Sequence, residues 1–372
     1  MLSVLIIDAE YGLTLDYMHC LTQVKNVKVY TICNEKNNNV KYSRYIEKFL
    51  FYPKTSSDVD VIKNINYEVK KNNIDLIVAI SEYGIRFLIE NKMLLNYPNK
   101  IVLLPELSYF DTANSKGLFA KHLQKFNIPA PKSILVQHFD SLDLENFKLN
   151  FPVLAKPIEG PGGGAGIILI KNINELKINF IDKKINSTYI IQEYIEGYDL
   201  GCNVLCKEGI IIEFTIQKGY LWNNKPFSYQ IGLEFIYNEQ VIILVKKLVK
   251  SLKWSGVANI DLRYDIKDDM LKVIEINPRY WGTLFGSYLS GVNFPYDHYM
   301  ASINRKILDS KYRQIKYLTL QGFIKTLKNN IFIIFQIAFI WHNTPFKFIF
   351  LEPKLTVVRL FKIFKRFFNS LF

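Results

Sequence analysis

The first hundred residues alternate short apolar runs with amphipathic stretches. The apolar runs lie at 3–8, 27–33, 74–80 and 101–104, and the stretch at 59–71 is a clear amphipathic example. Short continuous apolar runs separated by helical patterns are typical of strands buried on both faces of a parallel sheet. The pattern therefore predicts a doubly wound α/β domain over residues 1–108. Sheets of this kind bind small ligands at the carboxyl ends of their strands.

Ser81 and Glu82 directly follow the apolar run at 74–80. They therefore stand at the predicted carboxyl end of a strand, where a ligand would bind. The same two residues also suit a helix N-cap and its first turn. Both interpretations stay open at this point.

The pattern changes after Asp111. Residues 111–126 predict a helix with a capping start, and the prolines of NIPAPKS mark its end. The strand and helix patterns that follow lie at 151–157, 166–170, 188–195, 200–222, 240–252, 257–265 and 270–278. This mixture predicts a second, α+β domain over 109–304 with subdomains at 151–199 and 200–304. A C-terminal extension at 305–372 completes the chain.

A glycine-dense segment at 160–166 joins two of these predicted strands, and Lys156 ends the first of them. Glycines allow backbone N–H groups to approach a polyanion, and a lysine adds a compact positive charge for phosphate oxygens. The segment matches a dinucleotide-binding fingerprint only formally, because that fingerprint leads from a strand into a helix. A phosphate-covering loop and a flexible hairpin are the remaining alternatives.

Acidic and amide side chains converge on the last predicted hairpin. Glu275 and Asn277 lie two residues apart in a strand and share a face. If 257–265 pairs with 270–278 around the turn at 266–269, Asp261 falls opposite Glu275. Three oxygen-bearing side chains on one face suit Mg²⁺ that bridges nucleotide phosphates. The alternative is a solvated strand face with ordinary ion pairs.

Two arginines, Arg263 and Arg279, are predicted near the same face. Arginines there suit an anionic substrate or the charge of a transferring phosphoryl group.

The positive charge is concentrated at the C-terminal end. Lys and Arg exceed Asp and Glu by 47 − 34 = 13 over the chain, and residues 321–372 hold eight Lys or Arg against one acid. The rest of the chain is only mildly basic, which argues against a nucleic-acid-binding surface there. The apolar run at 331–341 is too short to span a bilayer as a helix. Residues 354–372 predict a basic amphipathic helix.

Three roles for this helix are open: contact with an anionic membrane surface, packing against the protein body or a dimer mate, and binding to a partner protein.

The four cysteines form no Cys-x-x-Cys pair and have no histidines at metal-ligand spacing, which indicates buried thiols in a reducing compartment. The N-terminus lacks the features of a signal peptide. We therefore expect a cytoplasmic protein, with the inner face of the membrane as its alternative location.

These motifs, in this order, resemble the ATP-grasp superfamily of carboxylate–amine ligases, which includes carbamoyl phosphate synthase large chains and D-alanine–D-alanine ligases. The motifs are SKGLFAKHLQKFNIPAPKS, FPVLAKPIEGPGGGAGIILI, IIQEYIEGYDL, and VANIDLRYD with VIEINPRYWG. The resemblance covers about Met1 to Asn304. It implies a pre-ATP-grasp domain at 1–108 and an ATP-grasp domain at 109–304, whose two subdomains enclose ATP.

The resemblance also implies roles for individual residues. The phosphates of ATP would be held by Lys116, Lys156, Gly162, Gly163, Gly164 and Gly166. Glu193, Tyr194 and Ile195 would form the hinge at the adenine, and Asp199 would bind the ribose. Asp261, Glu275 and Asn277 would hold Mg²⁺, with Mn²⁺ as an alternative. Arg279, Lys156 and Arg263 would be catalytic. Ser115 stands before Lys116 where the family often has Asp, and Asp199 stands where it often has Glu.

The implied activity is a ligase that converts a carboxylate to an acyl phosphate and couples it to an amine, releasing ADP and phosphate. The substrates would be small molecules, and a homodimer is the expected assembly. The alternatives are a carbamoylating, carboxylating or kinase-like ATP-grasp enzyme, and a non-catalytic nucleotide-binding module at a membrane. A Rossmann dehydrogenase is disfavoured because the glycine loop lacks the strand–loop–helix context.

Overall fold

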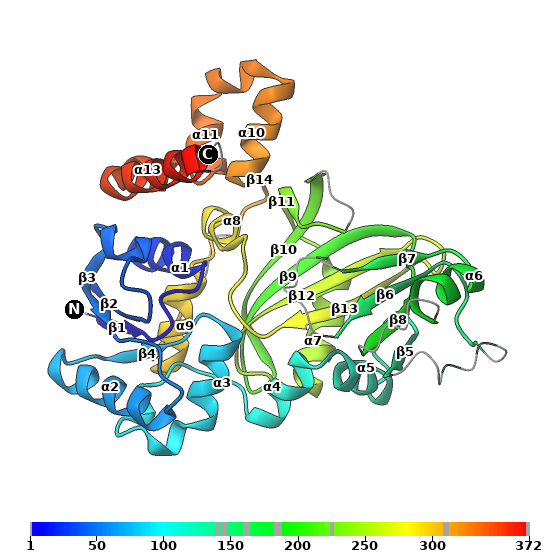
Figure 1. Cartoon of the computed structure of the whole chain (residues 1–372), viewed down its shortest axis with the longest axis horizontal. Coiled ribbons are helices and arrows are strands. Elements are labelled where there is room, and N and C mark those ends of the chain that lie inside the picture. The colour runs from blue at the N-terminus through cyan, green and yellow to red at the C-terminus, as the bar shows by residue number, and fades with distance from the viewer. Residues whose placement is uncertain are drawn as a thin grey trace.

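The computed structural model has three sheets arranged along the chain (Figure 1). It describes residues 2–137, 142, 144, 147–158, 164, 166–181, 188–223, 227–307 and 312–369, with side chains described as far as Lys362 in the last helix. Mixed α/β architecture with one parallel and two antiparallel sheets confirms the predicted fold class.

The N-terminal sheet is parallel and has the order β3-β2-β1-β4. Its strands are β1 (Leu2–Ile6), β2 (Val27–Cys33), β3 (Ile46–Phe51) and β4 (Leu76–Val78), with helices α1 (Thr14–Leu21), α2 (Asp58–Lys71) and α3 (Glu82–Glu90). The apolar runs predicted β1, β2 and β4. They did not predict β3, because its polar and half-exposed positions interrupt the run. The predicted strand at 101–104 is wrong: only Ile101 forms a bridge, to Ile77.

The smallest sheet lies next along the chain and carries the order β5-β8-β6-β7. Its antiparallel strands are β5 (Ser133–Val136), β6 (Val153–Pro157), β7 (Ile168–Ile170) and β8 (Tyr189–Glu193), with the short helix α6 (Ile173–Leu176). A separate apolar core that includes Val153, Leu176 and Phe180 lies beneath it. This core gives the subdomain its own packing.

The largest sheet has the order β13-β12-β9-β10-β11-β14 and is antiparallel. Its strands are β9 (Gly197–Lys207), β10 (Ile210–Trp222), β11 (Gln230–Ile236), β12 (Gly256–Asp265), β13 (Met270–Asn277) and β14 (Ile315–Leu318). Helix α7 (Glu239–Ser251) packs on it through the predicted apolar stripe, which is buried. The predicted turn at 266–269 lies between β12 and β13.

The single helix predicted at 111–126 is wrong. The chain forms two helices, α4 (Leu107–Asn114) and α5 (Lys116–Lys125), which are separated by Ser115 in an extended conformation. The Ser115 hydroxyl accepts a hydrogen bond from the N–H of Leu118 at 3.4 Å and so caps α5. The break places Lys116 in the first turn of α5.

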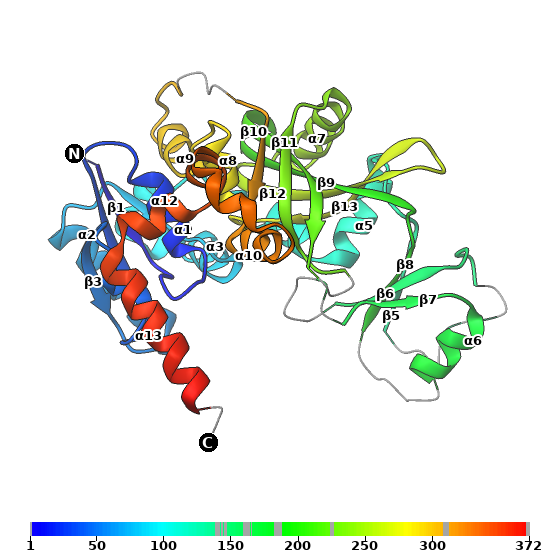
Figure 2. The same cartoon turned by 90° about the horizontal axis from the view of Figure 1, so that it is seen from above.

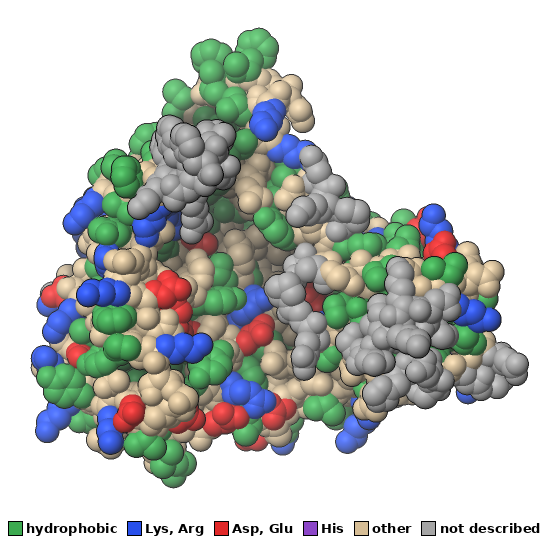
Figure 3. All heavy atoms as spheres, in the orientation of Figure 1, with side chains coloured by type: hydrophobic (Ala, Val, Ile, Leu, Met, Phe, Trp, Pro, Cys, Tyr) green, Lys and Arg blue, Asp and Glu red, His purple; other side chains and the backbone are tan. Residues whose placement is uncertain are grey.

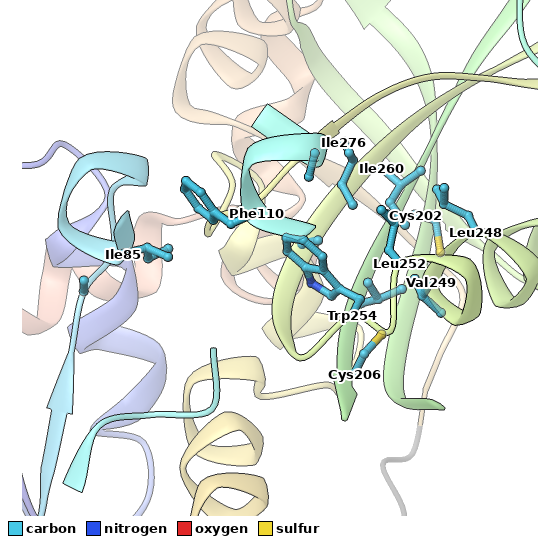
Figure 4. Packing of buried hydrophobic residues seen from close by; sticks show 14 of the residues in the cluster. Ile85, Phe110, Cys202, Cys206, Leu248, Val249, Leu252, Trp254, Ile260 and Ile276 are labelled. Atoms are coloured by element: carbon cyan, nitrogen blue, oxygen red, sulfur yellow. The ribbon is translucent and has the colours of Figure 1, made fainter. Parts of the chain in front are cut away.

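Trp254 lies at the centre of the core beneath the large sheet (Figure 4). Its side chain is fully buried, and its ring N–H donates to the carbonyl of Val257 at 3.4 Å. Leu248, Val249 and Leu252 from the α7 segment belong to the same cluster, together with Ile85 and Phe110 from the N-terminal region. This core therefore joins the N-terminal helices to the large sheet.

The C-terminal region forms a run of helices on one side of the molecule (Figures 1 and 2). After α8 (Leu284–Leu289) and α9 (Phe294–Ser302) come α10 (Leu320–Asn329), the 3-10 turn η6 (Ile331–Phe335), α11 (Ile337–Asn343), α12 (Phe346–Leu351) and α13 (Pro353–Asn369). None of the helices in the described ranges has both the length and the apolar character needed to cross a membrane.

We expect Trp254→Ala to lower the free energy of unfolding by about 3–5 kcal/mol, because it opens a large cavity in the core. Trp222→Ala is the matched control, since Trp222 is 42% exposed at the end of β10. Chemical denaturation of both variants measures the difference. Equal losses would contradict the central position of Trp254.

Candidate functional site

Two carboxylates meet on the face of the large sheet. Antiparallel pairing of β12 and β13 places Asp261 directly opposite Glu275, as the sequence predicted. Burial raises the pKa of Asp261 well above its ordinary value, and the neighbouring Glu275 raises it further through charge repulsion and a hydrogen bond. The Asn277 amide opposes this effect by donating to Oδ2 of Asp261 at 3.2 Å. A cation beside the pair would remove the repulsion.

This group contains only two acids. Within the residues that the structure describes, no cluster of three or more His, Cys, Asp or Glu side chains has metal-site geometry. The third predicted ligand is the amide of Asn277, whose Nδ2 faces Asp261 and Asn259 and whose Oδ1 faces Arg279. Two carboxylates and one amide oxygen form a hard, oxygen-only donor set suited to Mg²⁺.

A row of buried amides holds Asn277 from behind, and the sequence did not predict it. Asn259 accepts from Asn277 at 3.1 Å and donates to Oδ1 of Asn203 at 3.0 Å. The fully buried Asn203 in turn donates to the hydroxyl of Thr215 at 3.1 Å. The alternation of polar residues in β9 and β12 was the available signal. The row fixes the orientation of the Asn277 amide.

Lys156 faces the carboxylates, and Lys116 lies near Lys156. Lys156 ends β6 and donates to Oε1 of Gln192 at 2.6 Å, and Lys116 donates to the carbonyl of Pro157 at 2.8 Å. Burial lowers the pKa of Lys156, whereas the negative charge of Glu275 raises it and the positive charge of Lys116 lowers it. These mutual effects bring both lysines and the acid pair into one electrostatic group. The group can hold an anion and a cation side by side.

Only part of the predicted glycine loop can be placed. Gly162 and Gly163 lie outside the described residues. Gly164 and Gly166 have φ angles of +81° and +77°, which favour glycine. A Cβ on Gly164 would lie 2.0 Å from the carbonyl oxygen of Phe227. Gly164 is therefore required by the close approach of the segment that contains Phe227.

The predicted hinge connects the small sheet to the large one. Glu193 ends β8, Tyr194 and Ile195 follow, and Asp199 lies near the start of β9. Arg263 fixes this connection: its Nε donates to the carbonyl of Ile195 at 2.7 Å, and its side chain forms an ion pair with Asp199.

The same guanidinium group donates to the carbonyl of Gly197 at 2.9 Å. The structure thus places Arg263 at the hinge, and its predicted catalytic role stays a prediction. Asp199 shares its carboxylate with this arginine.

Arg279 connects the end of β13 to helix α3 of the N-terminal domain. Its Nε donates to Oε1 of Glu82 at 2.9 Å, and its Nη1 donates to the carbonyl of Tyr280 at 3.0 Å. Glu82 begins α3, and the side chain of Ser81 caps that helix by accepting from Gly84 at 3.0 Å. The capping interpretation of Ser81 is confirmed. Glu82 in addition reaches the site, which the sequence left open.

Asp8 positions the first turn of α3. Its carboxylate accepts from the backbone N–H of Ile80 at 3.0 Å and from the N–H and hydroxyl of Ser81 at 2.7 and 2.6 Å. Burial raises the pKa of Asp8 to about 6, although the bonds from Ser81 and Ile80 oppose the shift. Asp8 therefore supports, through Ser81 and Glu82, the position of Arg279.

The raised pKa of Asp8 predicts a pH dependence of stability. When a carboxyl group has a higher pKa in the folded protein than in the unfolded one, the protein loses stability as the pH rises from the unfolded pKa to the folded pKa. We expect the stability of Asp8→Asn relative to the natural protein to increase between about pH 4 and pH 6, by up to about 3 kcal/mol. Urea denaturation across this range measures the difference, and a constant difference would contradict the shift.

Residues 113–283 match the family model described as the ATP-grasp domain. The chain is 25% identical over 281 residues to the carbamoyl phosphate synthase large chain of Clostridium botulinum (strain Loch Maree / Type A3), with 72% of this chain and 25% of the relative covered. It is 23% identical over 212 residues to the D-aspartate ligase of Enterococcus faecium (strain Aus0004), with 50% and 49% covered. The chain thus spans half or less of the length of these relatives.

A solved structure of N5-carboxyaminoimidazole synthetase from Staphylococcus aureus, complexed with ADP, has the same fold. The TM-score is 0.67 at 14% sequence identity, with 88% of this chain and 86% of that chain covered. The family model covers a smaller, central part of the chain. These matches show that residues 113–283 are similar to the ATP-grasp domain family and that the chain shares its fold with this synthetase.

Proposed function

We propose that the protein is an ATP- and Mg²⁺-dependent ligase that phosphorylates a carboxylate and couples it to an amine. The observation that carries the proposal is the opposition of Asp261 and Glu275 to Lys156 and Lys116 in one electrostatic group. Such a group suits a metal-bound polyphosphate, because carboxylates attract the cation and lysines attract the phosphate oxygens.

The donor set fits Mg²⁺, with Mn²⁺ as an alternative. Repulsion within the Asp261–Glu275 pair raises the pKa of Asp261, and a divalent cation would reduce this repulsion. Asp261, Glu275 and Asn277 would hold the ion, and when bound it would offset the charge of the transferring phosphoryl group. The amide row behind Asn277 would keep that ligand oriented.

The nucleotide would lie between the two antiparallel sheets. Lys116, Lys156 and the glycine segment would contact its phosphates, and the hinge at Glu193, Tyr194 and Ile195 would contact the adenine. Arg263 supports this arrangement by fixing the carbonyl of Ile195. Asp199 would bind the ribose while it stays paired with Arg263.

The reaction would have two steps. A carboxylate oxygen of the substrate attacks the γ-phosphorus of ATP, and the bond from that phosphorus to ADP breaks. The amine nitrogen then attacks the acyl carbon, the bond to the phosphate oxygen breaks, and the nitrogen loses a proton as inorganic phosphate leaves. Arg279 would face the acyl phosphate or the acceptor, and its bond to Glu82 ties this position to the N-terminal sheet. Positioning and electrostatics carry both steps.

Other ATP-grasp reactions remain alternatives. One relative is named a ligase of D-aspartate and another a carbamoyl phosphate synthase chain, so the names alone favour neither reaction. A non-catalytic nucleotide module is disfavoured, because pure binding does not require the complete set of Asp261, Glu275 and Asn277. The cytoplasmic location and the homodimer stay predictions.

Release of ADP and phosphate from Mg-ATP tests the proposal, with pooled carboxylates and pooled amines supplied separately and together. We expect release that needs both pools. Glu275→Ala should lower it by at least about a hundredfold, because it removes a charge that acts in phosphoryl transfer. Glu239→Ala, at the exposed start of α7, is the matched control and should leave release unchanged.

Each other outcome has a definite meaning. Release that needs only one pool would assign the site to a kinase-like or carboxylating reaction. Release that survives Glu275→Ala would contradict the role of the acid pair. Nucleotide binding without turnover against both pools would favour the non-catalytic module over the ligase.

A further inference from the structure

The C-terminal helices expose a cluster of large apolar side chains. We define the apolar tip as Ile331, Phe332, Ile334, Phe335, Ile337 and Trp341, in η6 and α11. Their exposed fractions run from 36% for Trp341 to 74% for Ile337. Ile333 is 5% exposed and anchors the tip in a small core with Leu318 and Phe323. Single exposed apolar residues are ordinary, but a contiguous cluster of this kind marks an interaction surface.

Helix α13 adds a second exposed apolar stripe. Val357, Leu360 and Phe361 follow helical spacing and are 63%, 50% and 69% exposed. A helix that simply packed on the body would bury this stripe. Instead Lys362 on another side of the helix reaches the N-terminal domain, where its Nζ donates to the carbonyl of Asn37 at 2.9 Å and to Oδ1 of Asn39 at 2.6 Å. These polar contacts and the buried Leu355, which shares an apolar core with Val40, hold the helix on the N-terminal domain, whereas the stripe stays in solvent.

The start of α13 is fixed by the one acidic residue of the region. Glu352 is buried, accepts from the hydroxyl of Ser43 and the N–H of Arg44 at 2.9 Å each, and pairs with His19. His19 also stacks on Phe348 of α12. These contacts orient the helix rigidly on the N-terminal domain. They also withdraw the negative charge of Glu352 from the surface.

Among the described side chains of residues 321–362, the exposed charges are therefore all positive. Residues 321–372 contain eight Lys or Arg and only Glu352 as an acid. Lys328, Lys354 and Arg359 are exposed, near the apolar tip or on α13 itself. The ring of Trp341 contacts Phe350 of α12 at 6.2 Å, and Phe350 is 68% exposed, so the apolar tip continues onto α12. Apolar aromatic side chains among cations match the interface of an anionic bilayer.

The C-terminal helices lie together in space. Figures 1 and 2 place α10 to α13 together on one side of the molecule, away from the small sheet. Figure 3 shows hydrophobic side chains at the outer end of this region, with basic side chains close to them. We propose that the apolar tip and the stripe of α13 form a peripheral membrane-binding surface for anionic lipid. The catalytic domains would then face the solution beside the bilayer.

Binding of the full-length protein to lipid vesicles tests this proposal. We expect sedimentation with phosphatidylcholine vesicles that contain phosphatidylglycerol, weaker binding to phosphatidylcholine alone, and loss of binding as salt screens the charges. The double variant Phe332→Glu/Phe335→Glu should lower the partition coefficient at least about tenfold, because it places charges where apolar rings enter the interface. Both side chains are at least 70% exposed, so the fold should be unaffected.

A matched control replaces two exposed apolar residues by glutamate at another site. Met93→Glu/Leu94→Glu alters two residues of η2 (Lys92–Leu94) that are 88% and 61% exposed, and it should bind vesicles as the natural protein does. A second variant, Lys328→Gln/Lys354→Gln, should lower binding to anionic vesicles roughly tenfold without affecting binding to neutral ones.

Three outcomes would overturn the proposal. The natural protein would fail to bind anionic vesicles, or the control would lose binding as strongly as Phe332→Glu/Phe335→Glu. Alternatively, light scattering would show a dimer in solution that this double variant dissociates, which would assign the surface to a second copy of the chain. Vesicle binding requires no catalytic turnover, so the result is independent of the ligase proposal.

Discussion

The pairing of β12 with β13 holds two carboxylates side by side, and the other residues of the site surround this repulsive pair. The register of this hairpin sets Asp261 opposite Glu275, where like charges and burial disfavour ionisation. Lys156 faces the pair from the small sheet and offsets part of its charge, and Lys116 of α5 lies near Lys156. A divalent cation would offset the remainder. The architecture on both sides therefore serves to hold one charged group between two sheets.

The two arginines connect this group to its surroundings. Arg263 binds the backbone of the connection between the sheets at Ile195 and Gly197, so the strand that carries Asp261 also positions the hinge. Arg279 follows the strand that carries Glu275 and reaches Glu82 in the N-terminal domain. The two strands that carry the acid pair are thus joined to different neighbouring regions. A shift of these strands would therefore alter contacts both at the connection between the two antiparallel sheets and at α3.

Much of this arrangement was predictable from local patterns. The alternation along β12 and β13 and the short turn between them gave the register of Asp261 and Glu275, because period-two geometry leaves little freedom in a short hairpin. The apolar runs gave three of the four N-terminal strands. The order of the motifs gave the fold.

The remaining features depend on contacts between segments far apart in the sequence. The break at Ser115 was missed because a helical apolar pattern continues through it, although Ser115 carries a local signal as the N-cap of α5. The bond from Arg279 to Glu82 spans 197 residues. The amide row of the buried Asn203 and Asn259 and the half-buried Asn277 crosses three strands, whose adjacency follows only from the sheet order. The exposed stripe of α13 shows the limit of amphipathic patterns, which identify an apolar face but not what covers it.

The central claim is that the acid pair and the lysines form one site for a metal-bound nucleotide. Calorimetric titration with ADP, in the presence and absence of Mg²⁺, tests this claim without knowledge of the other substrates. The account predicts that Mg²⁺ strengthens ADP binding in the natural protein and has no effect in Asp261→Asn/Glu275→Gln. Equal affinity with and without Mg²⁺ in the natural protein, or no binding of ADP at all, would contradict it.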